Sequence, residues 1–484
     1  MIHHLSNSDV HFTPYLKLRV MKKLIPFLLL ISFSNFLNAQ IQSKSNAADG
    51  SITISPSGLI SAKSDESKST YNVALGPSAL LNNEANGSNN TAIGYRSLTE
   101  NTEGSYNTAF GSVSLVNNTL GSANNAFGSS SLFNNTEGNN NTAAGHVSMY
   151  YNTRGNSNTA FGYSSLNANT TGSINTAVGY RSLWFNTIGF YNVAIGGESL
   201  SKNTSGNNNT AVGFKSLYLN TEGDYNTTIG GESLSKNTIG INNTANGYKA
   251  MYSNTTGSHN TALGYTALYT NSEGERNTAI GRSSLTENTT GDRNTGVGYF
   301  ALQSNTTGYR NTALGYDADV SSGDVNNSIV IGYQATVDAS NKIRMGNAYI
   351  TAADIEVAWN VTSDRRKKEH IERVPLGLDF VNALKPVSYH RKNNEKADIE
   401  FGLIAQEVEE TLKDFGFSEN DLGFLDKGPD GYYSVRYNDL ISVLISAIQE
   451  QQKLLNVQDN SLTELNAKMD RIEAMLNADS AAKR

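Results

Sequence analysis

The feature that most constrains the fold of this sequence is a phrase of 17 residues that repeats through more than half of the chain. It stands as NTAIGYRSLTENTEGSY from Asn90 and returns as NTAFGSVSLVNNTLGSA from Asn107. Its first glycine recurs without a slip from Gly94 to Gly332. Helical-hairpin repeats need roughly 33 to 47 residues and propeller blades about 40 to 50, whereas 17 residues suit one coil of a β-solenoid. We therefore expect a mainly β chain in which residues 72–348 form a parallel β-roll.

The residues of the phrase predict the inside of each coil. Alternation in the strand puts Ala92 and Gly94 on one face, and Thr91 and Ile93 on the other. Both faces lack charge at these positions, so we expect both to be buried, with two short strands and two turns in each coil. Four residues after the first glycine stands a Leu or Met, as at Leu98, which is expected to fill the thin interior.

Turns and surface rows follow from the same phrase. The second glycine, Gly104, and the Asn-Thr pairs suit turns that need positive φ or side-chain bonds to the backbone, and stacked Asn can form an amide ladder. One surface position after the first glycine is repeatedly Tyr, which indicates either a stripe for a surface glycan or protein, or rings that only cover the flank. The recurring residues are Tyr95, Tyr163, Tyr180, Tyr248, Tyr265 and Tyr299.

Composition excludes several classes of function. The net charge of −7 gives no electrostatic reason to expect nucleic acid as a partner. The chain has no cysteine, so disulfides and thiolate metal sites are ruled out. His146 and His259 lie many coils apart, and no acid pair recurs in the array, so we expect no metal, no cofactor and no catalysis on an external substrate there.

The beginning of the chain contains a predicted secretory signal. MKKLIPFLLLISFSNFLNAQ starts at Met21 and combines a basic pair, an apolar run over residues 24–33 and a small residue, Ala39, suited to cleavage. We expect a secreted or cell-surface protein. The N-terminal divisions are a mis-assigned extension (1–20), a signal peptide (21–39) and a linker segment (40–71).

Two stretches of the array are similar to a known family. NTAIGYRSL and NSIVIGYQATVDASNKIRMGN resemble the head repeats of trimeric autotransporter adhesins, and the second shortens to a spacing of 14 between Gly332 and Gly346. The resemblance implies a left-handed parallel β-roll in which three chains pack around one axis. The main array departs from it by its longer period. Such adhesins end in membrane strands, whereas MLNADSAAKR is polar, so we expect no membrane-spanning anchor.

The chemistry of the chain changes at TSDRRKKEHI, after a connector over residues 349–362. LGLDFVNALKPVSY predicts a helix stopped by Pro386 and then a strand, IEFGLIAQEVEETL a strand and a helix, and GYYSVRYNDL a strand before a last long helix. We therefore expect a small α+β domain over residues 363–484.

The last helix carries a heptad pattern over residues 440–477, which predicts a coiled coil. Mixed Ile and Leu with two buried Gln favour three strands over two, hence a homotrimer. The seam positions are Ile441, Leu444, Ile448, Gln451, Leu455, Gln458, Leu462, Leu465, Met469, Ile472 and Leu476.

Three motifs in order, SDRRKKEHI, FGLIAQEVEE and YYSVRYNDLISVLISAIQEQQ, are similar to the intramolecular chaperone domain of phage tailspikes and endosialidases. The resemblance implies a domain that trimerises, helps the fibre before it to fold and then cuts itself off through a Ser-Lys dyad. Carried over by motif, the nucleophile is Ser363, the base is Lys368 and the cleaved bond joins Thr362 to Ser363. Members often carry His where this chain has Glu400, a departure that bears on cleavage more than on trimerisation.

The chemistry of such a dyad sets conditions on the geometry. Lysine can accept the hydroxyl proton only when its amine is neutral, which burial and the neighbouring cations of residues 365–367 favour. The alternative is a solvated basic face with Ser363 or Asp364 as helix N-cap. Five residues along a helix turn by about 140°, so either Ser363 precedes the helix or Lys368 comes from a neighbouring subunit.

These features together predict an exported homotrimeric surface fibre, an adhesin, whose C-terminal domain is an intramolecular chaperone and a single-turnover serine autoprotease. A phage-derived tail fibre of the same build is the alternative. The signal peptide favours the first, because phage fibres assemble in the cytoplasm.

Overall fold

The computed structural model describes residues 49–54, 60–64, 71–83, 87–356, 360–392, 398–418, 421–428 and 431–482. The N-terminal extension, the signal peptide and much of the linker segment predicted above lie outside these residues. The chain divides into two units, residues 1–248 and 249–484, which are described in turn.

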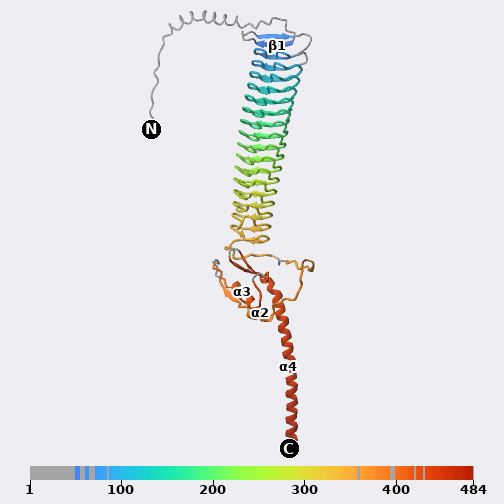
Figure 1. Cartoon of the computed structure of the whole chain (residues 1–484), viewed down its shortest axis with the longest axis vertical. Coiled ribbons are helices and arrows are strands. Elements are labelled where there is room, and N and C mark those ends of the chain that lie inside the picture. Colours follow the sequence, from blue (N-terminus) through green and yellow to red (C-terminus); the bar gives the residue numbers. More distant parts are fainter. Residues whose placement is uncertain are drawn as a thin grey trace, which may run out of the picture. The chain divides into compact units, whose positions relative to one another are not determined.

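The first unit contains an antiparallel pair, β1 (Asp49–Ile54) with β2 (Ile60–Ser64), and a stack of short parallel strands (Figure 1, blue to green). The strands of the stack are β3 (Val73–Leu75), β4 (Thr91–Ile93), β5 (Thr108–Phe110), β6 (Asn125–Phe127), β7 (Thr142–Ala144), β8 (Thr159–Phe161), β9 (Thr176–Val178), β10 (Val193–Ile195), β11 (Thr210–Val212), β12 (Thr227–Ile229) and β13 (Thr244–Asn246). Strands one coil apart in the stack pair in parallel, from β3 with β4 to β12 with β13.

The pairing keeps every repeat in register. Thr91 lies beside Thr108, Ala92 beside Ala109 and Ile93 beside Phe110, and the same offset of 17 residues holds from β4 onward, after an offset of 18 between β3 and β4. Ala92 is fully buried, and so is Leu98 on the opposite side of the coil. The predicted β-solenoid, and its interior of one small and one large apolar side chain per coil, are therefore confirmed.

Within the single chain only one face of each strand is buried, so the coil itself does not supply the burial expected for the other face. The last strand residue points outward, so that Phe110 is 54% exposed and Phe127 44% exposed. The Thr at the start of each strand is at best half-buried. Alternation therefore separates an inner Ala from an outer Thr and an outer apolar residue.

The predicted second strand is missing from the described 17-residue coils of the first unit, whereas in the second unit β18 (Asp319–Val320) and β20 (Thr336–Val337) occupy that side of their coils. Arg96 and Leu98 have φ of 51° and 52°, which lies outside the β region. That side of the coil still bonds to the next one, as Leu98 N–H donates to Ser114 O at 2.9 Å. The backbone ladder persists there without strand geometry.

The second glycine of the phrase has to lack a side chain, because the neighbouring coil packs too close to leave room for one. Gly104 does not have positive φ, but a Cβ at this position would lie 2.2 Å from Gly121 O and 2.5 Å from Asn101 Oδ1. The first glycine is the one with positive φ, 128° at Gly94. Of the two alternatives expected at this turn, positive φ is not found at Gly104, whereas side-chain bonding to the backbone is, because Asn101 Nδ2 donates to Gly104 O at 2.9 Å. Close approach of the neighbouring coil is the reason for glycine there.

Two ladders of buried Asn amides run through the coils, as the repeat predicts. In one, Asn118 Nδ2 donates to Asn101 Oδ1 at 2.8 Å and to Gly121 O at 2.9 Å. In the other, Asn124 N–H donates to Asn107 Oδ1 at 3.0 Å. These amides are fully buried, so each ladder satisfies polar groups that would otherwise be costly to desolvate.

The second unit begins with the same kind of coil and ends in an α+β region. The 14-residue spacing predicted from Gly332 is confirmed, because Ile329 pairs with Ile343. Its solenoid strands are β14 (Thr261–Leu263), β15 (Thr278–Ile280), β16 (Thr295–Val297), β17 (Thr312–Leu314), β18 (Asp319–Val320), β19 (Ile329–Ile331), β20 (Thr336–Val337) and β21 (Ile343–Met345).

The α+β region follows the predicted order of helices and strands, with one addition. The hairpin strand β24 was not predicted, although Gly-Pro-Asp-Gly at residues 428–431 is a turn signal. The elements are η1 (Arg365–Lys367), α2 (Leu378–Ala383), β22 (Val387–Tyr389), β23 (Glu400–Gly402), α3 (Ala405–Asp414), β24 (Leu425–Lys427), β25 (Tyr433–Val435), η2 (Tyr437–Asp439) and α4 (Leu440–Ala482).

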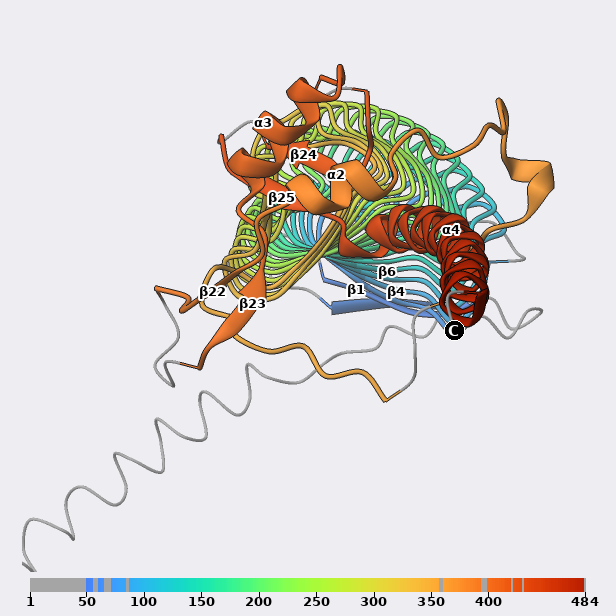
Figure 2. The same cartoon turned by 90° about the horizontal axis from the view of Figure 1, so that it is seen from below.

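A small apolar core holds this region together. Phe380 of α2, Leu412 of α3 and Val443 of α4 belong to one buried cluster. Figure 2 shows α2 beside the start of α4. Glu450 Oε2 of α4 accepts the backbone N–H of Leu378 at 2.7 Å, so the long helix supplies the N-terminal cap that Gly377 cannot.

Replacing Gly121 by Ala should destabilise the repeat region, because the new Cβ would lie 2.5 Å from both Asn118 Oδ1 and Gly138 O. We expect the free energy of unfolding to fall by about 2 kcal/mol, the range of overpacking in a close-packed interior. Denaturant titration followed by circular dichroism measures it. Leu120→Ala is the matched control, since Leu120 is its exposed neighbour; equal stability of the two variants would contradict the packing argument.

Candidate functional site

The basic motif forms a single 3-10 turn, η1, between two extended residues. Asp364 is the N-cap and Lys368 the C-cap, and both have extended backbone angles. Lys368 N–H donates to Arg365 O at 3.1 Å, which closes the turn. Ser363 therefore precedes the turn and Lys368 follows it.

The structure brings the two candidate catalytic side chains together within one chain. Lys368 Nζ lies 2.7 Å from Ser363 Oγ, a hydrogen-bond distance. Of the two arrangements left open by the sequence, a Ser363 that lies before the helical turn is the one observed. A lysine from a neighbouring subunit is not needed for this contact.

The acid next to the serine forms an ion pair inside the turn. Arg366 Nε and Nη2 donate to the Asp364 carboxylate at 3.1 and 2.6 Å, and the backbone N–H of Arg366 donates to Asp364 Oδ1 at 2.9 Å. The Arg366 side chain, and then its backbone N–H, lower the pKa of the Asp364 carboxyl. Asp364, and not Ser363, is thus the N-cap, and it stays ionised at neutral pH.

Both members of the dyad are exposed in the single chain, as is Thr362 on the other side of the candidate cleaved bond. The burial expected around the lysine is therefore not supplied by this chain's described residues. Val361, 75% exposed, lines an open hollow of about 860 Å³ together with Tyr437, Ile441 and Ile445 at the start of α4. The segment before the cleaved bond thus lies at the base of the long helix, which the sequence did not indicate.

Glu400, whose position was expected to bear on cleavage, is held by Tyr389 at the end of β22 and by Arg391 just beyond it. Its carboxylate accepts from Arg391 Nε at 2.9 Å and from the Tyr389 hydroxyl at 3.3 Å. Burial, and then the charge of Glu400, raise the pKa of Tyr389. In the described contacts Glu400 serves to pair β22 with β23.

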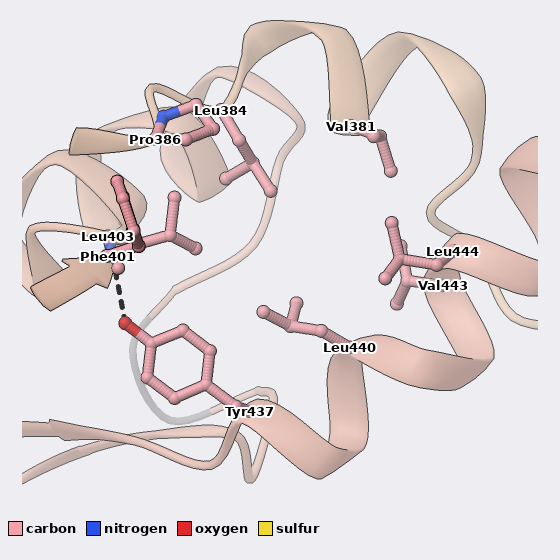
Figure 3. A pocket seen from close by; sticks show the side chains of 10 residues that line it. Val381, Leu384, Pro386, Phe401, Leu403, Tyr437, Leu440, Val443 and Leu444 are labelled. Atoms are coloured by element: carbon pink, nitrogen blue, oxygen red, sulfur yellow. Dashed lines mark hydrogen bonds between the residues drawn. The ribbon is translucent and has the colours of Figure 1, made fainter. Parts of the chain in front are cut away.

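A second hollow lies between α2, β23 and the first turns of α4. It has a volume of about 330 Å³ and an apolar lining that includes Leu384, Phe401 and Leu440 (Figure 3). The Tyr437 hydroxyl at its edge accepts the backbone N–H of Leu403 at 2.8 Å. The lining carries no charged side chain, so it offers packing surface and no catalytic group.

The tyrosine row of the repeats stacks on itself. Tyr299 and Tyr316 lie 5.3 Å apart between ring centroids with planes 6° apart, and Tyr316 stacks on Tyr333 at the same distance. The ring faces that would stack on a sugar are therefore covered by the neighbouring ring at these positions. Tyr163 and Tyr180 form a similar pair.

In the part of the chain that the structure describes, no group of three or more His, Asp or Glu side chains lies close enough to hold a metal ion. Among the helices in those parts of the chain, none is both long and apolar enough to cross a bilayer.

Comparison with known proteins adds one finding. Residues 363–417 match the model of a peptidase family described as "Chaperone of endosialidase". The C-terminal region is a chaperone-of-endosialidase domain. The match begins at Ser363, the candidate nucleophile, so the chaperone domain starts at the predicted cleavage point. No curated protein matches the chain. The chain therefore combines a β-solenoid with a C-terminal chaperone domain, an organisation that suggests a fibre with its own assembly factor.

Proposed function

We propose that this protein is an exported homotrimeric surface fibre, an adhesin, whose chaperone domain templates the trimer and then releases itself by cleavage between Thr362 and Ser363. The observation that carries the proposal is the 2.7 Å contact between Lys368 Nζ and Ser363 Oγ, made at the first residue of the matched domain. A surface glycan or protein is the ligand class proposed for the fibre.

The proposed reaction uses only groups of the chain and one water. Neutral Lys368 accepts the hydroxyl proton of Ser363. The Ser363 Oγ atom then attacks the carbonyl carbon of Thr362. The Thr362–Ser363 C–N bond breaks, the leaving amine takes the proton from Lys368, and an ester joins Thr362 to Oγ. Water then hydrolyses the ester, which leaves a carboxylate on Thr362 and frees the hydroxyl and amine of Ser363.

Trimerisation is supported by exposed apolar rows in the repeats. The outer strand residues stack in register, one per coil, and are apolar except at Asn246; soluble monomers rarely leave apolar patches of this size uncovered. We call these residues the outer rows. In the first unit they include Phe110, Phe127, Phe161, Val178, Ile195 and Ile229, and in the second Ile280, Leu314 and Met345.

The long helix supports the same proposal. α4 is continuous over its 43 residues, but only Leu440, Val443 and Ala447 are buried. The apolar seam positions farther along, such as Leu455 and Leu462, are about half exposed. Packing of three such seams would cover them and would also crowd the base of the helix, where Val361 lies.

Ser363→Ala and Lys368→Ala should each leave the chain at full length, because one variant lacks the nucleophile and the other lacks the base. The wild-type chain should yield two fragments on a denaturing gel. Ser388→Ala and Lys385→Ala are the matched controls, since both residues are exposed in the same domain. Cleavage that persists in Ser363→Ala would contradict the proposed dyad.

Leu455→Asp should weaken the trimer, because it places a charge in the predicted seam. Light scattering on uncleaved Ser363→Ala protein should give three times the chain mass of 52.2 kDa, and a lower mass for the Leu455→Asp variant. Val457→Asp is the control, because Val457 is similarly exposed on α4 but lies off the seam. A monomeric mass for the parent protein would overturn the trimer.

Replacing Leu28 by Arg within the apolar run of residues 24–33 should retain the protein inside the cell, because the predicted signal would lose its continuous apolar segment. Fractionation of producing cells, followed by immunodetection, measures this. A wild-type protein found only in the cytoplasm would favour the phage-derived tail fibre instead.

A further inference from the structure

Five residues separate Ser363 from Lys368, and their side chains meet because the backbone between them folds back. An extended chain would place residues at this separation roughly 17 Å apart. A regular α-helix would turn them to different sides. One 3-10 turn between two extended residues, as in η1, is what joins Nζ to Oγ at 2.7 Å. The geometry of the dyad therefore depends on whatever holds this single turn.

The residue that holds the turn is Asp364. Its carboxylate accepts the N–H of Arg366 at 2.9 Å, and its backbone carbonyl accepts the N–H of Lys367 at 3.1 Å. An isolated turn of three residues has little stability of its own, because fixing it costs more backbone entropy than its bonds return. η1 also buries no side chain, so packing within this chain does not supply the difference.

Arg366 fixes the capping carboxylate in place. Its guanidinium reaches both carboxylate oxygens while its own backbone N–H donates to one of them. The cap is thus oriented from within the turn. The positive guanidinium also compensates the negative charge that the cap brings near Lys368.

We propose that Asp364 is a positioning residue for self-cleavage: by capping the turn it holds Lys368 Nζ against Ser363 Oγ, while Arg366 orients its carboxylate. Asp364 does not contact the cleaved bond in this role. The inference rests on the proposed function, because it assigns a second residue to the same reaction.

The test compares cleavage rates of full-length chains made in a cell-free synthesis reaction, pulse-labelled and followed on denaturing gels. Asp364→Ala should cleave about tenfold more slowly, the size of effect that loss of an N-cap produces. Asp364→Asn should stay within about threefold of wild type, because Asn caps as well as Asp. Glu372→Ala, an exposed acid beyond the turn, is the control for loss of a negative charge. Light scattering on the same variants in a Ser363→Ala background checks that the oligomer is unchanged.

Rescue by Asn separates this role from others. If Asp364→Asn is as slow as Asp364→Ala, charge and not capping is what matters, and the proposal fails. If Asp364→Ala cleaves at the wild-type rate, the proposal fails while the proposed function stands. A wild-type chain that never cleaves contradicts both, and Ser363→Ala distinguishes self-cleavage from the action of another protease.

Discussion

The structure depends on the in-register pairing of each coil with the next, at an offset of 17 residues through the main array. Every strand residue faces its own equivalent one coil away, and the buried Asn101 and Asn118 amides continue the same register inside the coil. Because the ladders allow no slip, the interior can be as thin as one Ala and one Leu per coil. Gly104 belongs to the same constraint, since a Cβ there would collide with the neighbouring coil.

The same register determines how side chains are arranged on the surface of the solenoid. Whatever residue type the phrase places outward is repeated in a row, which explains both the stacked tyrosines and the apolar outer rows. A globular protein could scatter such side chains, but a solenoid aligns them. The outer rows and the exposed seam of α4 are separate features, yet both would be covered by further copies of the chain, which is why we connect them through the proposed trimer.

The candidate site of the chaperone domain does not depend on the repeat register. It depends on one local turn, η1. The dyad is complete within one chain, but Ser363, Lys368 and Thr362 are all exposed. Val361, two residues before the match begins, lines a hollow with Ile441, the first residue of the predicted seam. A change at the base of α4 during the proposed assembly would therefore reach the residues next to the candidate cleaved bond. This supports the proposal that cleavage follows assembly.

Much of this could be predicted from the sequence, and the failures have physical reasons. The period, the buried Leu98 and the Asn ladders follow from residue identity at a fixed spacing. The prediction of a second strand is wrong for coils such as that of Leu98, because Leu98 takes positive φ. Its residue type does not indicate this backbone conformation. The outer face is not buried within the single chain, because a lack of charge does not indicate whether a row is covered by the coil itself or by another copy. For Ser363 and Lys368, the sequence named the pair but left two geometries open and offered either Ser363 or Asp364 as the cap; the structure shows the cap at Asp364, with Ser363 before the turn.

An experimental structure of the uncleaved Ser363→Ala protein, determined by electron cryo-microscopy, tests the central claim most directly. The account predicts three chains around one axis, with outer-row residues such as Phe110 and Phe127 buried between them and the three α4 seams in contact. A single chain with its outer rows facing solvent would contradict it.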